Sequence, residues 1–69
     1  MHMSQYLVLN THSEPLRLLD TQDVEQLKMD LSTKPFVKLP AYLPEVPTTV
    51  QICINTNAVA YWAIYQDEA

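Results

Sequence analysis

The sequence predicts an α+β fold: a small antiparallel sheet of about three to five strands, including a C-terminal hairpin, with one amphipathic helix packed on one face. Three observations predict it. Apolar residues repeat at helical spacing in the middle of the chain, two later segments are rich in β-branched and aromatic residues, and four of the five prolines separate these regions. No second-domain boundary appears, so residues 1–69 are predicted to form a single domain.

The first strand is predicted over residues 5–9, which are aromatic and β-branched. Residues 10–15 then supply turn-forming side chains. Residues 16–19 have two interpretations: a second short strand that pairs back on the first, or an irregular approach to the helix. At the start of the chain, Met1 and His2 are interpreted as a cloning remnant and Met3 as the native start.

The helix is predicted over residues 21–32. Asp20 or Thr21 caps it, because the side-chain oxygens of these residues can accept hydrogen bonds from backbone amides of the first turn. Met29 lies off the apolar stripe of this helix and is either a partly exposed residue at its margin or an adaptable contact for a partner. The stripe, which can lie against a sheet, consists of Val24, Leu27 and Leu31.

Residues 34–47 are predicted to form a proline-rich edge strand and connector. Pro35 prevents the helix from continuing, and residues 36–39 form one short strand before Pro40. A proline at each end favours an edge position for that strand, and residues 41–47 then form a stiff connector. Pro44 and Pro47 also match the Pro-x-x-Pro pattern of polyproline ligands, but the interleaved apolar residues favour a connector that covers the core.

Residues 48–55 and 58–66 are the strongest strand signals and are predicted to pair as a hairpin. Because the chain has no glycine, a three-residue loop over residues 55–57 is favoured, with Asn57 in the left-handed region. The predicted cross-strand pairs on the helix-facing side are Ile54–Ala58, Ile52–Ala60 and Val50–Trp62. The residues predicted on the outer side are Gln51, Cys53, Val59, Tyr61, Ala63 and Tyr65.

This outer face supplies the candidate functional residues. Tyrosines mixed with glutamine and small apolar residues suit a partly buried contact, because tyrosine offers a large area and a polar tip at low entropic cost. The alternative is an ordinary half-solvated sheet face. The candidate partner-binding residues are Gln51, Tyr61, Tyr65 and, on the helix, Met29.

Composition argues against several other functions. Four basic against eight acidic residues give a net charge of −4 with no basic cluster, so no nucleic-acid partner is expected. No apolar run approaches the roughly 18 residues of a membrane span, so a cytoplasmic protein without membrane contact is expected. Cys53, the single cysteine, is interpreted as a small packing residue. No catalytic residue, metal ligand or cofactor is predicted, because metal-ligand spacing and glycine-rich phosphate loops are missing from the sequence.

These observations favour a small acidic non-enzymatic interaction protein, such as a regulator, inhibitor or accessory subunit, that binds through the outer sheet face. The partner is another protein or a second copy of the chain, the latter giving a homodimer, because a core of this size is marginal without support. The alternative is a small oligomeric enzyme with a site shared between subunits near His12 and Tyr61.

Overall fold

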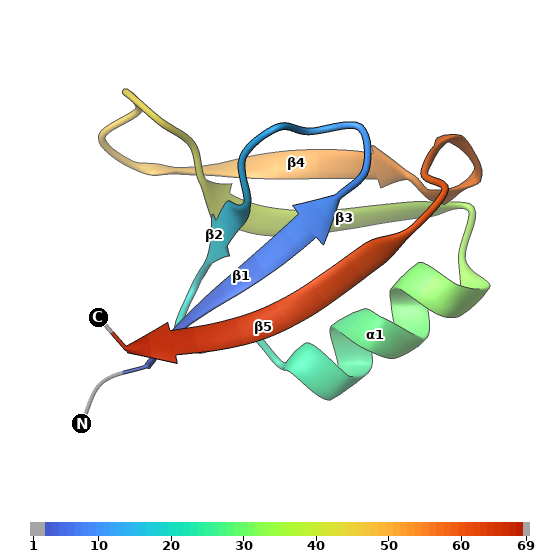
Figure 1. Cartoon of the computed structure of the whole chain (residues 1–69), viewed down its shortest axis with the longest axis horizontal. Coiled ribbons are helices and arrows are strands. Elements are labelled where there is room, and N and C mark those ends of the chain that lie inside the picture. Colours follow the sequence, from blue (N-terminus) through green and yellow to red (C-terminus); the bar gives the residue numbers. More distant parts are fainter. Residues whose placement is uncertain (1–2, 69) are drawn as a thin grey trace.

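The computed structural model describes residues 3–68, which form one sheet and one helix (Figure 1). The predicted α+β class is confirmed. No helix in this range is long and apolar enough to cross a membrane. Met1 and His2, interpreted as a cloning remnant, lie outside the described residues. The elements in chain order are β1 (Met3–Leu9), β2 (Leu16–Leu18), α1 (Val24–Thr33), β3 (Phe36–Tyr42), β4 (Thr49–Asn55), the 3-10 turn η1 (Thr56–Ala58) and β5 (Trp62–Glu68).

The five strands form a single antiparallel sheet in the order β4-β3-β2-β1-β5. The first of the two interpretations of residues 16–19 is confirmed, because β2 pairs back on β1 and places Arg17 opposite Tyr6. On its other side β1 pairs with β5 along the full length of both strands, with Leu7 opposite Ile64. The first and last strands of the chain are therefore neighbours in the sheet.

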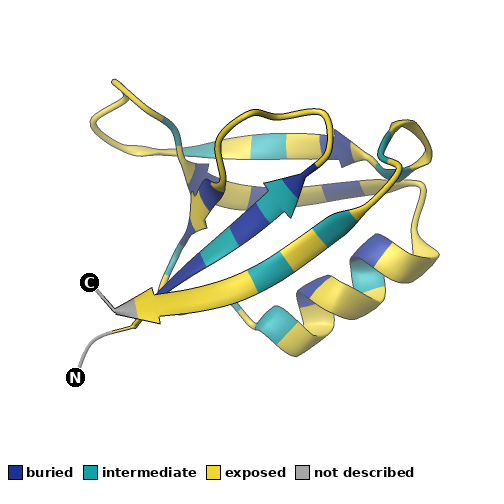
Figure 2. Ribbon diagram, in the orientation of Figure 1, coloured by how far each residue is buried: buried dark blue, intermediate teal, exposed yellow. Residues whose placement is uncertain are grey.

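The core lies between α1 and one face of the sheet and is entirely aliphatic at its centre (Figure 2). Alternate residues of the strands point into it, and Leu7 and Leu18 are completely buried. The predicted helix stripe is confirmed, because Leu27 and Leu31 are buried and Val24 is half-buried. The buried cluster consists of Leu7, Leu9, Leu16, Leu18, Leu27, Leu31, Val37, Leu39 and Ile54.

The helix begins later than predicted. Its N-cap is Asp23, whose carboxylate accepts a hydrogen bond from the Gln26 amide at 3.1 Å, so the prediction of Asp20 or Thr21 as the cap is wrong. The reason is a separate turn ahead of the helix, closed by the Gln22 amide donating to the Leu19 carbonyl at 3.0 Å. At the other end, helical geometry stops at Thr33, one residue beyond the predicted end, and the prediction that the helix does not continue through Pro35 is confirmed.

The predicted C-terminal hairpin is wrong, because β4 and β5 form opposite edges of the sheet. Instead of turning back, the chain after β4 enters η1, where the Asn55 side chain accepts from the Asn57 amide at 3.1 Å. Thr56 anchors this turn on the start of β3: its amide donates to the Pro35 carbonyl at 3.0 Å and its hydroxyl to the Lys34 carbonyl at 2.6 Å.

A second anchor brings the chain to β1. The Asn10 side chain accepts a hydrogen bond from the Ala60 amide at 2.8 Å, and β5 then continues alongside β1. The predicted pairs Ile54–Ala58, Ile52–Ala60 and Val50–Trp62 therefore do not form; Ile52, for example, lies opposite Leu39 of β3. Asn57 is not left-handed either. Among the described residues the positive φ belongs to Glu45, at 66°.

The proline-rich segment is also placed differently from the prediction. β3 is an internal strand between β4 and β2, it runs through Pro40 to Tyr42, and residues 43–48 close a hairpin with β4 rather than connecting to a later one. Pro40 is tolerated for two reasons. The Thr56–Pro35 hydrogen bond makes Phe36–Asn55 a non-hydrogen-bonded pair, so by alternation Pro40 needs no donor towards β4. On the other side, β2 pairs with β3 only at Tyr42 and Ala41 and stops before Pro40.

Candidate interaction surface

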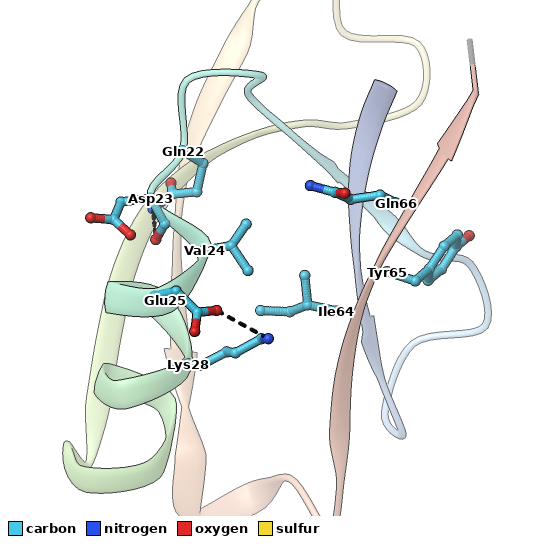
Figure 3. Close-up of a pocket in the computed structure, with 8 residues that line it drawn as sticks. All are labelled: Gln22, Asp23, Val24, Glu25, Lys28, Ile64, Tyr65 and Gln66. Atoms are coloured by element: carbon cyan, nitrogen blue, oxygen red, sulfur yellow. Dashed lines mark hydrogen bonds and ion pairs between the residues drawn. The ribbon is translucent and has the colours of Figure 1, made fainter. Parts of the chain in front are cut away.

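The sheet face opposite α1 is not covered by any described element. We call it the open face. The strand register defines which residues share it, because directly opposite residues point to the same side. Figure 3 shows the alternation on β5, where Ile64 points towards Val24 of the helix and Tyr65 points away from it. The open face carries Ser4, Tyr6, Val8, Arg17, Phe36, Lys38, Pro40, Tyr42, Thr49, Gln51, Cys53, Asn55, Ala63, Tyr65 and Asp67. Ser4, opposite Asp67, is itself buried.

Four of these residues form a single row across the sheet. Tyr65 lies opposite Tyr6, Tyr6 opposite Arg17, and Arg17 opposite Tyr42, so the row runs from β5 through β1 and β2 to β3. The rings of Tyr6 and Tyr65 stack with centroids 5.1 Å apart and planes 18° apart. The guanidinium carbon of Arg17 lies 5.0 Å from the ring centroid of Tyr42. We call these four residues the tyrosine–arginine row.

The row is ordered before any partner arrives. An offset aromatic pair contributes about 0.5–1.5 kcal/mol beyond burial, and a cation–π contact about 0.5–1 kcal/mol when exposed. These contacts hold the side chains in place while leaving area open, since Tyr65 is 42 % exposed and Tyr42 is 38 % exposed. Less side-chain entropy is then lost when a partner binds. Phe36, 57 % exposed, adds apolar area at the other end of β3.

Positive charge also concentrates on the open face. Two of the four basic residues are paired with acidic residues of α1: Lys28 on the helix with Glu25 at 3.1 Å, and Lys34 at its C-cap with Asp30 at 3.2 Å. The other two, Arg17 and Lys38, lie on the open face, and Lys38 forms no ion pair within residues 3–68. An acidic chain thus presents its remaining cations among aromatic side chains, with Asp67 at the end of β5.

The structure separates the predicted site residues. Gln51 and Tyr65 share the open face, but they lie on β4 and β5 at opposite edges of the sheet. Tyr61 lies ahead of β5, 62 % exposed, where its carbonyl accepts from the Asn10 amide at 3.3 Å. Met29 lies on α1 and is 62 % exposed, on the other side of the molecule from the open face. The four residues do not form one surface.

The predicted outer side of β4 and β5 was partly correct despite the wrong hairpin. Gln51, Cys53, Ala63 and Tyr65 do share a face, because alternation along a strand does not depend on which strand it pairs with. Two interpretations need correction. Val59 is half-buried against the core, and Cys53 is an exposed free thiol rather than a packing residue.

Tyr6, Arg17 and Tyr42 were not among the predicted site residues. Each had a local signal, because each alternates with residues that point into the core, as Arg17 does between Leu16 and Leu18. No local signal in the sequence indicated that they align in one row, since this alignment depends on the pairing of strands distant in sequence.

Two clefts flank the core. The first, about 610 Å³, lies between α1 and β5 (Figure 3), where the helix leaves Ile64 half-exposed. Its ionic groups include the Glu25–Lys28 pair, already engaged. The second, about 500 Å³, is mainly aliphatic and lies between the β1–β2 loop, β4 and η1, with His12 among its lining residues. Within residues 3–68, no three His, Cys, Asp or Glu side chains are grouped to hold a metal ion.

The comparisons with protein-family models, curated proteins and solved structures found no match for this chain. Its function is therefore inferred from its own surface.

Proposed function

We propose that the chain is a small acidic non-enzymatic interaction protein, a regulator, inhibitor or accessory subunit, that binds a protein partner through the open face. The observation that supports this most is the tyrosine–arginine row on a sheet face that the described part of the chain leaves uncovered. Tyrosine and arginine are, with tryptophan, the residue types enriched at the energetic centres of protein interfaces.

The charges on the open face indicate the chemistry of the partner. Arg17 and Lys38 lie among Tyr42, Pro40 and Phe36, so a complementary surface carries carboxylates between apolar side chains. A single-stranded nucleic acid also stacks on aromatic side chains, but it needs a positively charged groove along its backbone. Two cations on a chain of net charge −4 do not supply one.

Selection from a displayed library of random peptides tests this proposal. We expect the wild-type chain to enrich peptides that combine Asp or Glu with aliphatic residues. Arg17→Gln and Tyr65→Ala should each weaken binding of the selected peptides by about tenfold or more, because they remove the cation or the outer ring of the row.

The matched control is Lys28→Gln, which makes the same charge change on α1, away from the open face. Equal peptide binding by wild type and Arg17→Gln would refute the proposal. So would tighter binding of oligothymidine than of any selected peptide, since that outcome assigns the face to nucleic acid. A Tyr61→Ala variant tests whether the contact is confined to the tyrosine–arginine row. Weakened peptide binding by this variant would show that the contact includes the segment just before β5.

The alternative enzyme has one observation in its favour. Asn10 ties the segment of Tyr61 to the β1–β2 loop that carries His12, so both residues lie at the same end of the sheet. A shared site still needs a second subunit to bring further groups to them. If His12→Ala leaves binding of the selected peptides unchanged, the interaction protein is favoured. If a catalytic activity is found that His12→Ala abolishes, the enzyme is favoured.

A further inference from the structure

The free edge of β4 lacks the usual protection of edge strands. β4 pairs with β3 on one side only, and its seven residues contain no charged residue and no proline. Natural sheets block such edges with charges, prolines, bulges or a covering element, because unpaired backbone groups recruit another strand. The opposite edge, β5, ends in Asp67 and Glu68 and has α1 across the first cleft. The β5 edge therefore has charged residues and a nearby helix that hinder strand addition, whereas the β4 edge has neither charge nor proline.

The strand register identifies the backbone groups that are free on β4. The Thr56–Pro35 hydrogen bond makes Asn55 part of a non-hydrogen-bonded pair with Phe36, and such pairs alternate along an antiparallel ladder. The residues that direct their N–H and C=O groups away from β3 are therefore Thr49, Gln51, Cys53 and Asn55. Beyond the β3–β4 ladder, none of these backbone groups bonds to another backbone group within residues 3–68.

We propose that two copies of the chain pair β4 against β4, antiparallel, about a two-fold axis at Ile52, which joins their sheets into one. In this register Gln51 lies opposite Cys53 of the second copy, and Thr49 opposite Asn55 of the second copy. All four outward-directed residues then fall in hydrogen-bonded pairs, which gives about eight new backbone hydrogen bonds. An axis at Gln51 would pair only residues 49–53 of β4, and an axis at Cys53 would pair only residues 51–55, so either register forms fewer hydrogen bonds within the strand.

The side chains of β4 favour a second copy as the occupant. On the core side, Ile52 meets its own counterpart, and half-buried Val50 meets Ile54 of the second copy. β-branched pairs of this kind stabilise adjacent strands. The second, aliphatic cleft lies beside Ile52 and Ile54, so the added strand presents more aliphatic side chains next to it. The eight acidic residues all lie outside β4, so two acidic chains meet where neither carries a carboxylate.

Sedimentation and light scattering across about 0.01 to 1 mM test the dimer, since strand pairing with little side-chain burial gives weak association. We expect the average mass to rise towards twice 7.9 kDa. Gln51→Pro should abolish this rise, because it removes an outward N–H that β3 does not use. Gln66→Pro, at the other edge, is the matched control and should leave association unchanged.

Cross-linking tests the register independently of any proline effect on folding. Gln51→Cys places a thiol opposite Cys53 of the second copy at a Cα separation of about 5.5 Å, within disulfide range. Mild oxidation should therefore link two chains, whereas Gln51→Cys combined with Cys53→Ser should not link them.

A wild-type chain that stays monomeric to about 1 mM overturns the proposal. A dimer that survives Gln51→Pro, or that forms equal disulfide in the doubly substituted control, overturns the β4 edge or this register. Tyr65→Ala, on the open face, should leave the dimer intact, so failure of this proposal is distinguishable from failure of the proposed function.

Discussion

Gln5 is the polar residue that lies on the core face of β1, and it is only 7 % exposed. Its amide nitrogen donates to the Leu19 carbonyl at 3.1 Å and to the Gln22 carbonyl at 3.3 Å. Its oxygen accepts from the Gln66 side chain at 3.2 Å. One side chain thus connects β1 to the segment that leads into α1 and to β5.

The substitution Gln5→Leu keeps similar volume but removes all three hydrogen bonds. It leaves the Gln22 carbonyl without this donor, at about 1–3 kcal/mol if that group stays buried, whereas the Leu19 carbonyl still accepts from the Gln22 amide. The three lost hydrogen bonds and the unsatisfied Gln22 carbonyl outweigh the apolar burial that leucine gains, so the expected net loss is about 2 kcal/mol. A domain of this size has a total stability of about 3–10 kcal/mol, so this is a large fraction of it.

Urea unfolding measures this loss directly. Trp62 is the single tryptophan and is half-buried beside the core, so its fluorescence reports the transition. Gln66→Leu is the control: it removes one of the three bonds but leaves both carbonyls with their donor, and should cost less than about 1 kcal/mol. Equal stability of Gln5→Leu and wild type, or equal losses in the two variants, would refute the assigned role of Gln5.

Two further predictions concern α1. Asp23→Ala should lower the free energy of unfolding by about 1 kcal/mol by removing the N-cap, whereas Thr21→Ala should change it by less than about 0.5 kcal/mol; equal losses in urea unfolding would reject Asp23 as the cap. The Gln26 side chain, 3.0 Å from Asp30, together with Lys34, lowers the pKa of Asp30 below its ordinary value of 3.8, against the opposing effect of desolvation. The ionised carboxyl therefore stabilises the fold above about pH 4, and this contribution is lost as the pH falls through the lowered pKa. Asp30→Asn should show a smaller loss of stability than wild type between about pH 4 and pH 2, and parallel pH profiles would count against it.

Local features of this fold were predictable from the sequence, because they depend on neighbours in the chain. The apolar stripe of α1 and its end before Pro35 follow from helical periodicity and from proline geometry. The inward and outward sides of β4 and β5 follow from strand alternation alone. The N-cap was missed because Asp20, Thr21 and Asp23 can all cap a helix. The turn at Leu19–Gln22 decides among them.

Strand pairing was not predictable in the same way. The segment after β4 contains ordinary turn residues, and what prevents a hairpin there is hydrogen bonding to distant residues: Thr56 to Lys34 and Pro35, and Ala60 to Asn10. Likewise, Pro40 suits an internal strand because it needs no donor towards β4 and because β2 is too short to reach it. The tyrosine–arginine row has the same origin, since four strands must be aligned before it exists.

The pairing of β1 with β5 has a consequence for how a newly made chain acquires its fold. β2, α1, β3 and β4 all lie between these two strands in the sequence, so they can assemble while the outer side of β1 still has no strand beside it. Closing a pair of strands this far apart in sequence also slows folding relative to fold types dominated by local contacts. The partly folded chain therefore carries two open edges, β1 and β4, until pairing of β5 with β1 leaves β4 and β5 as the edges of the sheet.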